Sequence, residues 1–409
     1  MKITKVTFAE GRAGFYNEDL LSIKKGAQPN GLVYSDPPIT PGFETIVQPG
    51  RCISVMLTLE DGSVGFGDCM DVIFSGQAGR DPLFKPEEHM PFLENTLPKV
   101  LIGKAVDKFR PLAEEIDKMT HDGRRVHTAL RYGITQAILH ATALANRTTI
   151  AEVVAAEYNT KLVAKPIPIL ANCEPFDHLA IDKAIVKKAD LLPHGAFPQV
   201  VRDLGLRGEK LKEYTRKLVA RIHEIGAQGY KPAIHYDLYG SAAELFDNDP
   251  DRMVDYFAEL EQTAAPYDLY IESPAVMRDR AEQIEMFSAL SERIRAKGLR
   301  VRLIADEWCN TLDDIKAFAK AKAADFVQVK TPDLGGVNNT IEALIYARQN
   351  DVGACLGGSA NETDQSTRIT TQIGLACDPS FMLSKPGFGC DESLMILTNE
   401  MTRTLALVK

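Results

Sequence analysis

Two segments decide the fold: LIADEW (303–308) and, after a helical spacer, FVQVKTPDLGG (326–336). Each begins as an apolar run and ends on charged residues, Asp306 and Glu307 in the first and Lys330 in the second. An apolar run, a helix and another apolar run make the pattern of a βαβ unit. Parallel strands are buried on both faces, so charges at their C-terminal ends are not explained by packing. Active sites of β/α barrels lie at that end. We therefore expect Asp306 and Lys330 to belong to a site.

Similar units continue on both sides of this stretch. Strand-like runs occupy 166–173, 233–240, 269–274, 301–308, 326–332, 353–358 and 381–383, and helical patterns occupy 204–225, 249–264, 278–296, 312–322, 338–349 and 363–376. Seven or eight such units in about 240 residues are typical of a TIM-like (β/α) barrel. A doubly wound open sheet is the alternative, but it needs a Gly-rich phosphate loop after its first strand. The segment PIPILANCEP (166–175) is not such a loop.

The first 160 residues have a different pattern. A strand is expected at 1–10, a hairpin at 52–59 and 64–68, and helices near 87–119 (interrupted at its prolines) and 125–147. This predicts an α/β protein in which an α+β N-terminal capping domain (1–160) precedes the barrel catalytic domain (161–409). The Pro- and Gly-rich segment 26–50 is either an active-site lid or a surface excursion.

Composition limits the class of protein. A formal net charge of −9 and the lack of a basic run argue against nucleic-acid binding. The seven cysteines are odd in number and form no CxxC pair, which favours free thiols in a reducing compartment. No signal peptide and no membrane-spanning run is recognisable. We expect a cytoplasmic protein with no membrane partner.

Three carboxylates end successive strands: Asp237 in AIHYDLYG, Glu272 in LYIESP and Asp306 in LIADEW. The separations of 35 and 34 residues each fit one strand and helix unit, so the three acids are expected to converge at the barrel mouth. Close carboxylates repel each other unless a cation neutralises them, and Mg²⁺ prefers such oxygen ligands. The alternative for each acid is a surface position or a helix N-cap.

Lys330 lies one further unit along and shares a strand face with Gln328. A lysine near a metal and other cations can act as a base, although it can also extend to solvent. His194 follows Leu-Leu-Pro and, taken alone, has the pattern of a loop residue; His235 is expected to be structural.

These residues carry a family resemblance that spans nearly the whole chain. Asp–Glu–Asp at strand ends, a later lysine and an α+β N-terminal domain resemble the enolase superfamily, and more specifically the methylaspartate ammonia-lyase family. The stretches that resemble this family include GRDPLF (79–84), HTALRYGITQAIL (127–139), LLPHGAF (191–197), LGLRGEKLKEY (204–214), DLYG (237–240), ADEWCNT (305–311), QVKTPDLGGVNN (328–339), KPGFG-x-DE (385–392) and NEMTRTLAL (399–407).

The resemblance implies roles for single residues. It implies that Asp237, Glu272 and Asp306 bind Mg²⁺, with a monovalent cation such as K⁺ as a further cofactor. Lys330 matches the base that removes the C3 proton of the substrate, and His194 matches a histidine on the opposite side. Gln328 matches a contact to the substrate carboxylate, and Leu383 lines the pocket around its side chain. A homodimer is implied as well.

The chain departs from the family at the substrate pocket. Asn172 in ANCEPFD stands where the family has the glutamine of GQSGDD or AQSGDD. Ser359 and Ala360 in GGSANET stand for Thr-Cys, and Ile73 stands for the glutamine of QYSG. Asparagine keeps the amide with a shorter reach, and serine keeps the hydroxyl, whereas isoleucine removes a polar group. These four residues are expected to contact the substrate. Their departures from the family pattern indicate either a different amino-acid substrate or sequence drift, and this choice stays open.

The expected function is a carbon–nitrogen lyase for a small amino-acid substrate. Such an enzyme would eliminate ammonia from 3-methylaspartate, or a related 3-substituted aspartate, through an enolate stabilised by Mg²⁺, to give mesaconate or an analogue. One alternative is a racemase, epimerase or dehydratase on the same scaffold, because Lys330 and His194 could supply two bases. The other is a non-catalytic metal-binding protein.

Overall fold

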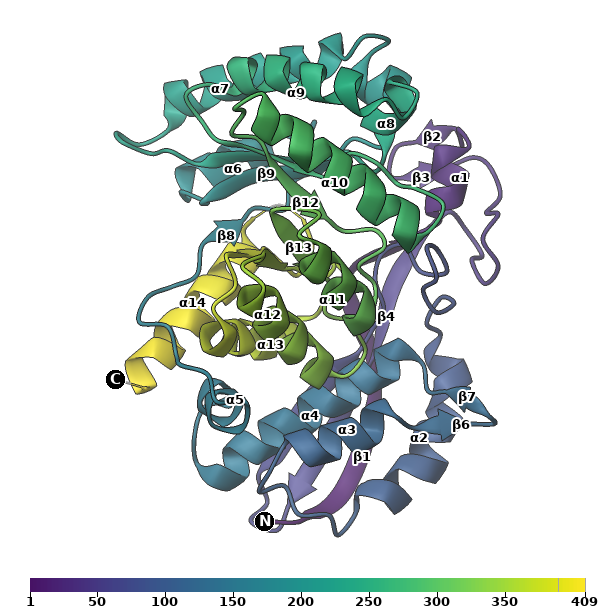
Figure 1. Ribbon diagram of the computed structural model, residues 1–409. Helices are drawn as coiled ribbons and strands as arrows, with labels where there is room; N and C mark the ends of the chain where they lie inside the picture. The colour runs from purple at the N-terminus through teal and green to yellow at the C-terminus, as the bar shows by residue number, and fades with distance from the viewer. Residues whose placement is uncertain (389, 409) are drawn as a thin grey trace.

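The structure, a computed structural model, describes residues 1–388 and 390–408. Its centre is a closed barrel of parallel strands (Figure 1). The strands follow one another around the barrel in the order β10-β11-β12-β13-β14-β15-β8-β9. Their bounds are β8 (Ile169–Leu170), β9 (Leu191–Ala196), β10 (Ala233–Asp237), β11 (Leu269–Glu272), β12 (Arg302–Ala305), β13 (Phe326–Val329), β14 (Gly353–Leu356) and β15 (Phe381–Leu383). The predicted TIM-like barrel is confirmed, and the open sheet is excluded.

Helices connect successive strands around this barrel. They are α6 (His178–Val186), α7 (Glu209–Ile225), α8 (Ser241–Leu245), α9 (Pro250–Ala264), α10 (Arg280–Ala296), α11 (Leu312–Ala321), α12 (Val337–Gln349), α13 (Asp364–Cys377) and α14 (Glu392–Leu407), with a short π-helical segment at Val200–Leu204 before α7. Local sequence determines where several of these helices begin. Asp249 and Asp279 accept backbone N–H groups at the first turns of α9 and α10, and Thr311 forms a capping box at α11.

Strand β9 was missing from the sequence prediction, which gave a helix at 204–225 as the first element after 166–173. The strand carries Pro193 and Gly195, two residues that weaken any strand pattern. Its pairing with β10 contains an irregularity, since Pro193 pairs with His235 and Ala196 with Asp237. The extra residue is a bulge that includes His194, whose φ of 63° is left-handed. Bulges re-aim side chains, which explains how a histidine after Leu-Leu-Pro comes to face the barrel mouth.

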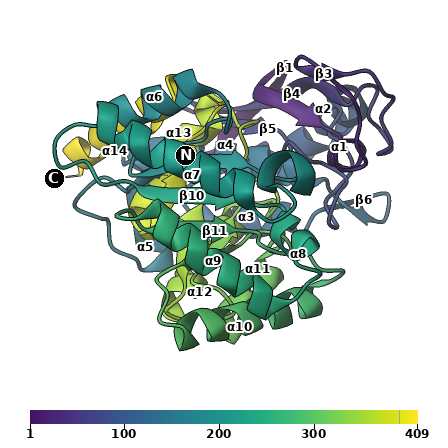
Figure 2. The same ribbon diagram turned by 90° about the horizontal axis from the view of Figure 1, so that it is seen from above.

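The N-terminal part is an antiparallel sheet covered by helices. Strand β1 (Ile3–Glu18) pairs with β4 (Val47–Leu59), which pairs with β5 (Val64–Cys69). Helices α2 (Pro86–Leu101), α3 (Arg110–Asp117), α4 (Thr128–Asn146) and α5 (Ile150–Tyr158) follow, with a small ribbon of β6 (Thr120–His121) and β7 (Arg124–Arg125). Seen from above, this sheet lies to one side of the barrel, away from α9 and α10 (Figure 2).

Two details of this part differ from the prediction. The first strand continues to Glu18 because it stays paired with β4 beyond residue 10. The predicted helix at 87–119 is two helices that separate at residues 102–109, whereas Pro91 and Pro98 lie inside α2. The backbones of α4 and β5 pack directly against each other. A Cβ atom on Gly67 would lie 2.2 Å from the Gly133 carbonyl oxygen, which is too close. The glycine therefore permits this packing.

The segment 26–50 extends from α1 (Leu20–Lys24) and includes a small ribbon of β2 (Pro29–Asn30) and β3 (Val33–Tyr34). Asp19 fastens it, because its carboxylate accepts the backbone N–H groups of Ile39 and Thr40. Lys24 Nζ donates to the Tyr239 carbonyl at 3.0 Å, which joins this region to the barrel mouth. Its role as a lid stays a prediction.

All seven cysteines are buried and unbridged, as expected from their spacing. In the described part of the chain, none of the helices combines the length and apolar character needed to traverse a bilayer.

Candidate active site

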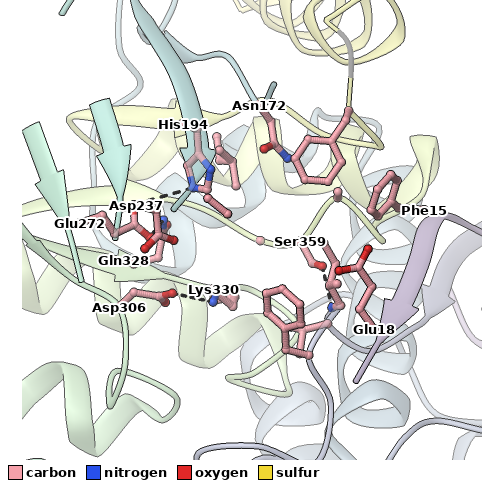
Figure 3. Close-up of a pocket in the computed structure, with 18 of the residues that line it drawn as sticks. Phe15, Glu18, Asn172, His194, Asp237, Glu272, Asp306, Gln328, Lys330 and Ser359 are labelled. Atoms are coloured by element: carbon pink, nitrogen blue, oxygen red, sulfur yellow. Dashed lines mark hydrogen bonds and ion pairs between the residues drawn. The ribbon is translucent and has the colours of Figure 1, made fainter. Parts of the chain in front are cut away.

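A cavity lies at the C-terminal ends of the barrel strands, and all eleven residues singled out from the sequence line it (Figure 3). They are Ile73, Asn172, His194, Asp237, Glu272, Asp306, Gln328, Lys330, Ser359, Ala360 and Leu383. Asp237 and Glu272 are the last residues of β10 and β11, and Asp306 directly follows β12. The register of β10 and β11 pairs Asp237 with Glu272, so the convergence expected from the spacing is observed.

The carboxylates form a buried acidic group. Asp237, Glu272 and Asp306 are each at most 2% exposed. Burial, followed by the charge of Glu272, raises the pKa of Asp237 well above its usual value. Burial likewise raises the pKa of Asp306. The Oδ2 atom of Asp237 and the Oε2 atom of Glu272 are buried without a hydrogen-bond partner. Buried acceptors of this kind fit a cation or a ligand donor as their partner.

His194 joins this group. One ligand atom each from His194, Asp237 and Glu272 lies within 4.8 Å of the others. Burial lowers the pKa of His194 to about 4, so the ring is neutral near pH 7. Its ring stacks on that of His235, with centroids 5.1 Å apart and planes inclined by 10°. His194 therefore has a fixed orientation at the edge of the acidic group.

His235 lies behind the cavity and supports the acidic group. It is fully buried, and its Nε2 atom lies 3.0 Å from Glu272 Oε2, close enough for an ion pair but without hydrogen-bond geometry. Residues two apart in a strand share a face, so His235 points the same way as Asp237. Although burial opposes ionisation, the contacts from His235, His194 and Gln328 lower the pKa of Glu272.

Lys330 follows β13 and faces this group from the other side. Its Nζ atom donates to Asp306 Oδ2 at 2.8 Å. Burial works against the ammonium form, but the charge of Asp306 outweighs it, and the pKa of Lys330 is raised. Strands β9 and β13 are four positions apart in a ring of eight, so His194 and Lys330 lie across the mouth from each other.

Arg80 was not predicted as a site residue. It lines the cavity, its side chain is 4% exposed, and it donates to Asp333 at 2.8 Å and lies 3.3 Å from Glu307. Glu307 is likewise a new member of this network; despite burial, Lys330 and Arg80 lower its pKa to about 2. The motif GRDPLF (79–84) was the only signal for Arg80, because its partners are more than 200 residues away in the chain.

The four residues expected to depart from the family pattern line one wall of the cavity. Ser359 Oγ accepts the backbone N–H groups of Ile73 at 3.0 Å and Asn361 at 3.3 Å. Because Ser359 Oγ is the acceptor in both hydrogen bonds, its hydroxyl proton remains available to donate to a ligand. Asn172 donates its backbone N–H to Ser384 at 2.7 Å, and its Oδ1 atom is buried without a partner.

The rest of this wall is apolar or acidic and was not predicted. It includes Phe15, Glu18, Val72, Phe74, Glu174, Tyr239 and Phe388. The rings of Phe15 and Phe388 meet edge to face at 4.5 Å. Burial, with the charge of Glu174, raises the pKa of Glu18 to about 7.

A second buried charge network lies behind the loop that carries Ser359. Lys385 Nζ is 2.7 Å from Glu362 Oε2 and donates to the Gly357 carbonyl at 2.6 Å, and both side chains have no exposed surface. Glu362 also accepts the Tyr132 hydroxyl and the Ser359 backbone N–H. The network thereby connects α4, β15 and the Ser359 loop.

Sequence models of a known family match the whole chain. The N-terminal model of methylaspartate ammonia-lyase matches residues 1–159, and the C-terminal model matches residues 161–409. The chain belongs to the methylaspartate ammonia-lyase family. Methylaspartate ammonia-lyase 2 of Carboxydothermus hydrogenoformans is 48% identical, with 100% of this chain and 99% of the relative covered. Methylaspartate ammonia-lyase of Clostridium tetanomorphum is 46% identical, with 100% and 99% covered.

Solved structures of this family have the same fold. The crystal structure of β-methylaspartase from Clostridium tetanomorphum, a Mg complex, matches with a TM-score of 0.95 over 100% of this chain and 99% of that one, at 46% identity. Methylaspartate ammonia-lyase of Citrobacter amalonaticus, containing (2S,3S)-3-methylaspartic acid, matches with a TM-score of 0.97 at 43% identity, with both chains fully covered. Muconate lactonizing enzyme of Pseudomonas putida shares the fold at 16% identity, with a TM-score of 0.60, over 92% of this chain and 85% of that one.

Proposed function

We propose that this protein eliminates ammonia from 3-methylaspartate, or a closely related 3-substituted aspartate, to give mesaconate or its analogue. The family supports the reaction class, and the residues of the cavity support the roles. The observation that carries the proposal is the meeting of Asp237, Glu272 and Asp306 with Lys330 and His194 on opposite sides of one buried cavity.

The acidic group fits a Mg²⁺ ion. Three buried carboxylates have too few protein partners, and two of their oxygens have none. Hard divalent cations take such oxygen ligands. We assign Asp237, Glu272 and Asp306 as the residues that would hold the ion, with K⁺ as a further candidate cofactor. When bound, the cation supplies positive charge that stabilises the negative charge developing on the substrate carboxylate.

Lys330 is the proposed base. In its neutral form, Nζ accepts the C3 proton; the electron pair forms the C2=C3 double bond, and the C2–N bond breaks to release ammonia. The lysine must lose its own proton first. Two features favour this: repulsion from Arg80 opposes the rise in the pKa of Lys330, and Asp306 would hold the lysine less strongly when its charge faces a cation.

The remaining cavity residues position the substrate. The Ser359 hydroxyl can donate to a carboxylate, and Gln328, which donates its Nε2 hydrogen to Glu272 at 3.1 Å, presents its amide beside the acidic group. Asn172 has the amide that the family places here on a longer side chain. Ile73, Ala360 and Leu383 give the substrate side chain an apolar surface, so we infer that the 3-substituent packs against them.

The decisive test is turnover of the purified protein with Mg²⁺ and (2S,3S)-3-methylaspartate. Ultraviolet absorbance of the unsaturated diacid and an ammonia assay should rise together. The Lys330→Ala variant should lose both signals, and Lys322→Ala, which changes an exposed lysine, should keep them. If aspartate, 3-methylaspartate and longer 3-alkyl analogues all fail to release ammonia, the proposal is wrong.

An isomerase is the second candidate, because Lys330 and His194 lie on opposite sides of the cavity. Racemisation or epimerisation needs a base on each face, which Lys330 and His194 could provide. Loss of optical rotation without a change in absorbance would favour this activity over elimination. A dehydratase would instead release an unsaturated product from a hydroxy acid without ammonia. A purely metal-binding role would show Mg²⁺ binding and no turnover of any of these substrates.

Three further assignments stay predictions. We propose that residues 1–160 act as a capping domain, since Phe15, Ile73 and Arg80 from this part reach the cavity of the barrel. We also propose a homodimer in the cytoplasm, which light scattering on the purified protein and fractionation of the source cells would test.

A further inference from the structure

Two cysteines meet beside the cavity. The Sγ atoms of Cys173 and Cys390 lie 3.2 Å apart, and both residues have no exposed surface. The two residues are 217 positions apart in the chain, on the segments that follow the barrel strands β8 and β15. A disulfide requires about 2.05 Å between sulfurs, so a small movement would allow a bond.

The surroundings of the pair favour thiol chemistry over metal binding. In the described part of the chain, neither cysteine belongs to a group of three metal-ligating side chains. Cys173 contacts the Ala180 carbonyl of α6 at 3.7 Å, and Lys187 Nζ donates to the Cys390 carbonyl at 3.3 Å. Lys183 and Lys187 both pair with Asp391, so two ammonium groups lie next to Cys390.

These contacts distinguish the two thiols. The hydrogen bond shared with Cys173, in which either sulfur can be the donor, lowers the pKa of Cys390 despite burial; Lys187 and Lys183 add to this effect, and Asp391 opposes it. The same hydrogen bond and burial raise the pKa of Cys173. A thiolate beside cationic groups is the nucleophile in thiol oxidation, and a neighbouring thiol resolves the product.

Both segments also form walls of the cavity. Cys173 lies between Asn172 and Glu174, which line the cavity, and Cys390 is two positions after Phe388, which lines it as well. A covalent bond here would connect two walls of the substrate pocket.

We propose that Cys173 and Cys390 form an oxidative modification site, a dithiol that peroxide converts into a disulfide joining the β8 and β15 segments. The Cys390 thiolate attacks hydrogen peroxide, the O–O bond breaks, hydroxide leaves and a sulfenic acid forms. The Cys173 sulfur then attacks the Cys390 sulfur and the hydroxyl group leaves as water with the Cys173 proton. Two electrons pass from the thiols to the peroxide, and a dithiol reductant reverses the step.

The test is mass spectrometry of the intact enzyme before and after hydrogen peroxide, with free thiols alkylated. We expect the loss of two hydrogen atoms and a peptide pair linked through Cys173 and Cys390, both reversed by dithiothreitol. Cys173→Ser and Cys390→Ser should not form the link, and Cys52→Ser, a buried cysteine of the N-terminal sheet, should form it normally. Six or seven alkylatable thiols after treatment, or a link between other cysteines, would overturn the proposal.

The effect on the pocket is a separate measurement that rests on the proposed function. Because an ångström-scale displacement in a site can reduce catalysis by up to about 10²-fold, we expect kcat/KM of the linked enzyme to fall about tenfold and to recover on reduction. A linked enzyme with unchanged kcat/KM would refute the coupling to the pocket. If no turnover exists at all, the mass spectra still decide whether the cysteines react.

Discussion

Lys330 Nζ lies 2.8 Å from Asp306 Oδ2, and the carboxylate is 2% exposed. The same carboxylate is one of the three proposed metal ligands, so it is shared between the base and the cation site. A cation that draws the negative charge of Asp306 weakens its hold on the lysine proton. Under the proposed roles, metal binding and activation of the base would therefore be coupled through one side chain.

Replacing the base should abolish elimination and leave the protein folded. For Lys330→Ala we expect a fall in kcat of about 10²- to 10⁴-fold, the usual contribution of general base catalysis. Substrate binding, measured by isothermal titration, should change less than kcat. The exposed Lys322→Ala serves as the control. A Lys330→Ala enzyme with nearly full rate would rule out the lysine assignment.

Metal removal should reduce both activity and stability. The acids of the site repel one another in the absence of a cation, and Mg²⁺ at 100 times its Kd would stabilise the folded state by about 2.7 kcal/mol. We expect a chelator to lower the melting temperature and added Mg²⁺ to restore it.

Asp237→Asn provides the matched variant for metal removal. Replacing one of the mutually repelling carboxyl groups by an amide should raise the melting temperature of the metal-free protein while weakening its response to Mg²⁺. A melting temperature independent of Mg²⁺ in the unaltered enzyme would contradict the assigned site.

Glu18 should make stability depend on pH. Its pKa is about 7 in the folded protein, mainly through burial, against 4.5 for the ordinary side chain. The folded state then holds the proton more tightly than the unfolded state, so stability is present below pH 4.5 and falls as pH rises to about 7. Glu18→Gln should reduce this fall in urea unfolding between pH 5 and 8. The exposed Glu44→Gln should unfold with the pH dependence of the parent protein.

The buried pair Lys385 and Glu362 should matter more than a surface pair. Removing one partner of a buried ion pair typically destabilises a protein by about 3–5 kcal/mol, because the other charge is left alone. We expect Lys385→Met to approach this range in chemical unfolding. Lys104→Met, which breaks an exposed pair with Glu115, should change stability by about 0–1 kcal/mol. Equal effects of the two substitutions would show that Lys385 is not a structural anchor of the Ser359 loop.

Sequence periodicity was sufficient to predict most of the barrel strands. Buried parallel strands are apolar runs in the sequence, and the acidic residues mark their ends. Periodicity failed at β9, where Pro193, His194 and Gly195 interrupt the run and a bulge restores the strand through its neighbours. The breaks of the N-terminal helices were also misplaced, since tertiary packing allows Pro91 and Pro98 to stay helical. Such outcomes depend on contacts between distant segments, which a local pattern does not contain.

The site residues also fall into those that the strand pattern predicts and those that it does not. Asp237, Glu272, Asp306 and Lys330 were predicted because each ends or directly follows a regular strand, one strand and helix unit after the last. The prediction of His194 and of the proposed substrate contacts required the family resemblance. Arg80 and Glu307 were missed as site residues, because a long-range ion pair between a loop and the barrel leaves no periodic signal.

The division between strand ends and loops has a consequence for substitutions. The proton-transfer residues are anchored to the barrel, whereas Asn172, Ile73, Ser359 and Ala360 sit on connecting segments whose replacement leaves the strands untouched. Substitutions in the cavity wall can therefore alter the surface that a substrate meets without displacing the residues at the barrel mouth.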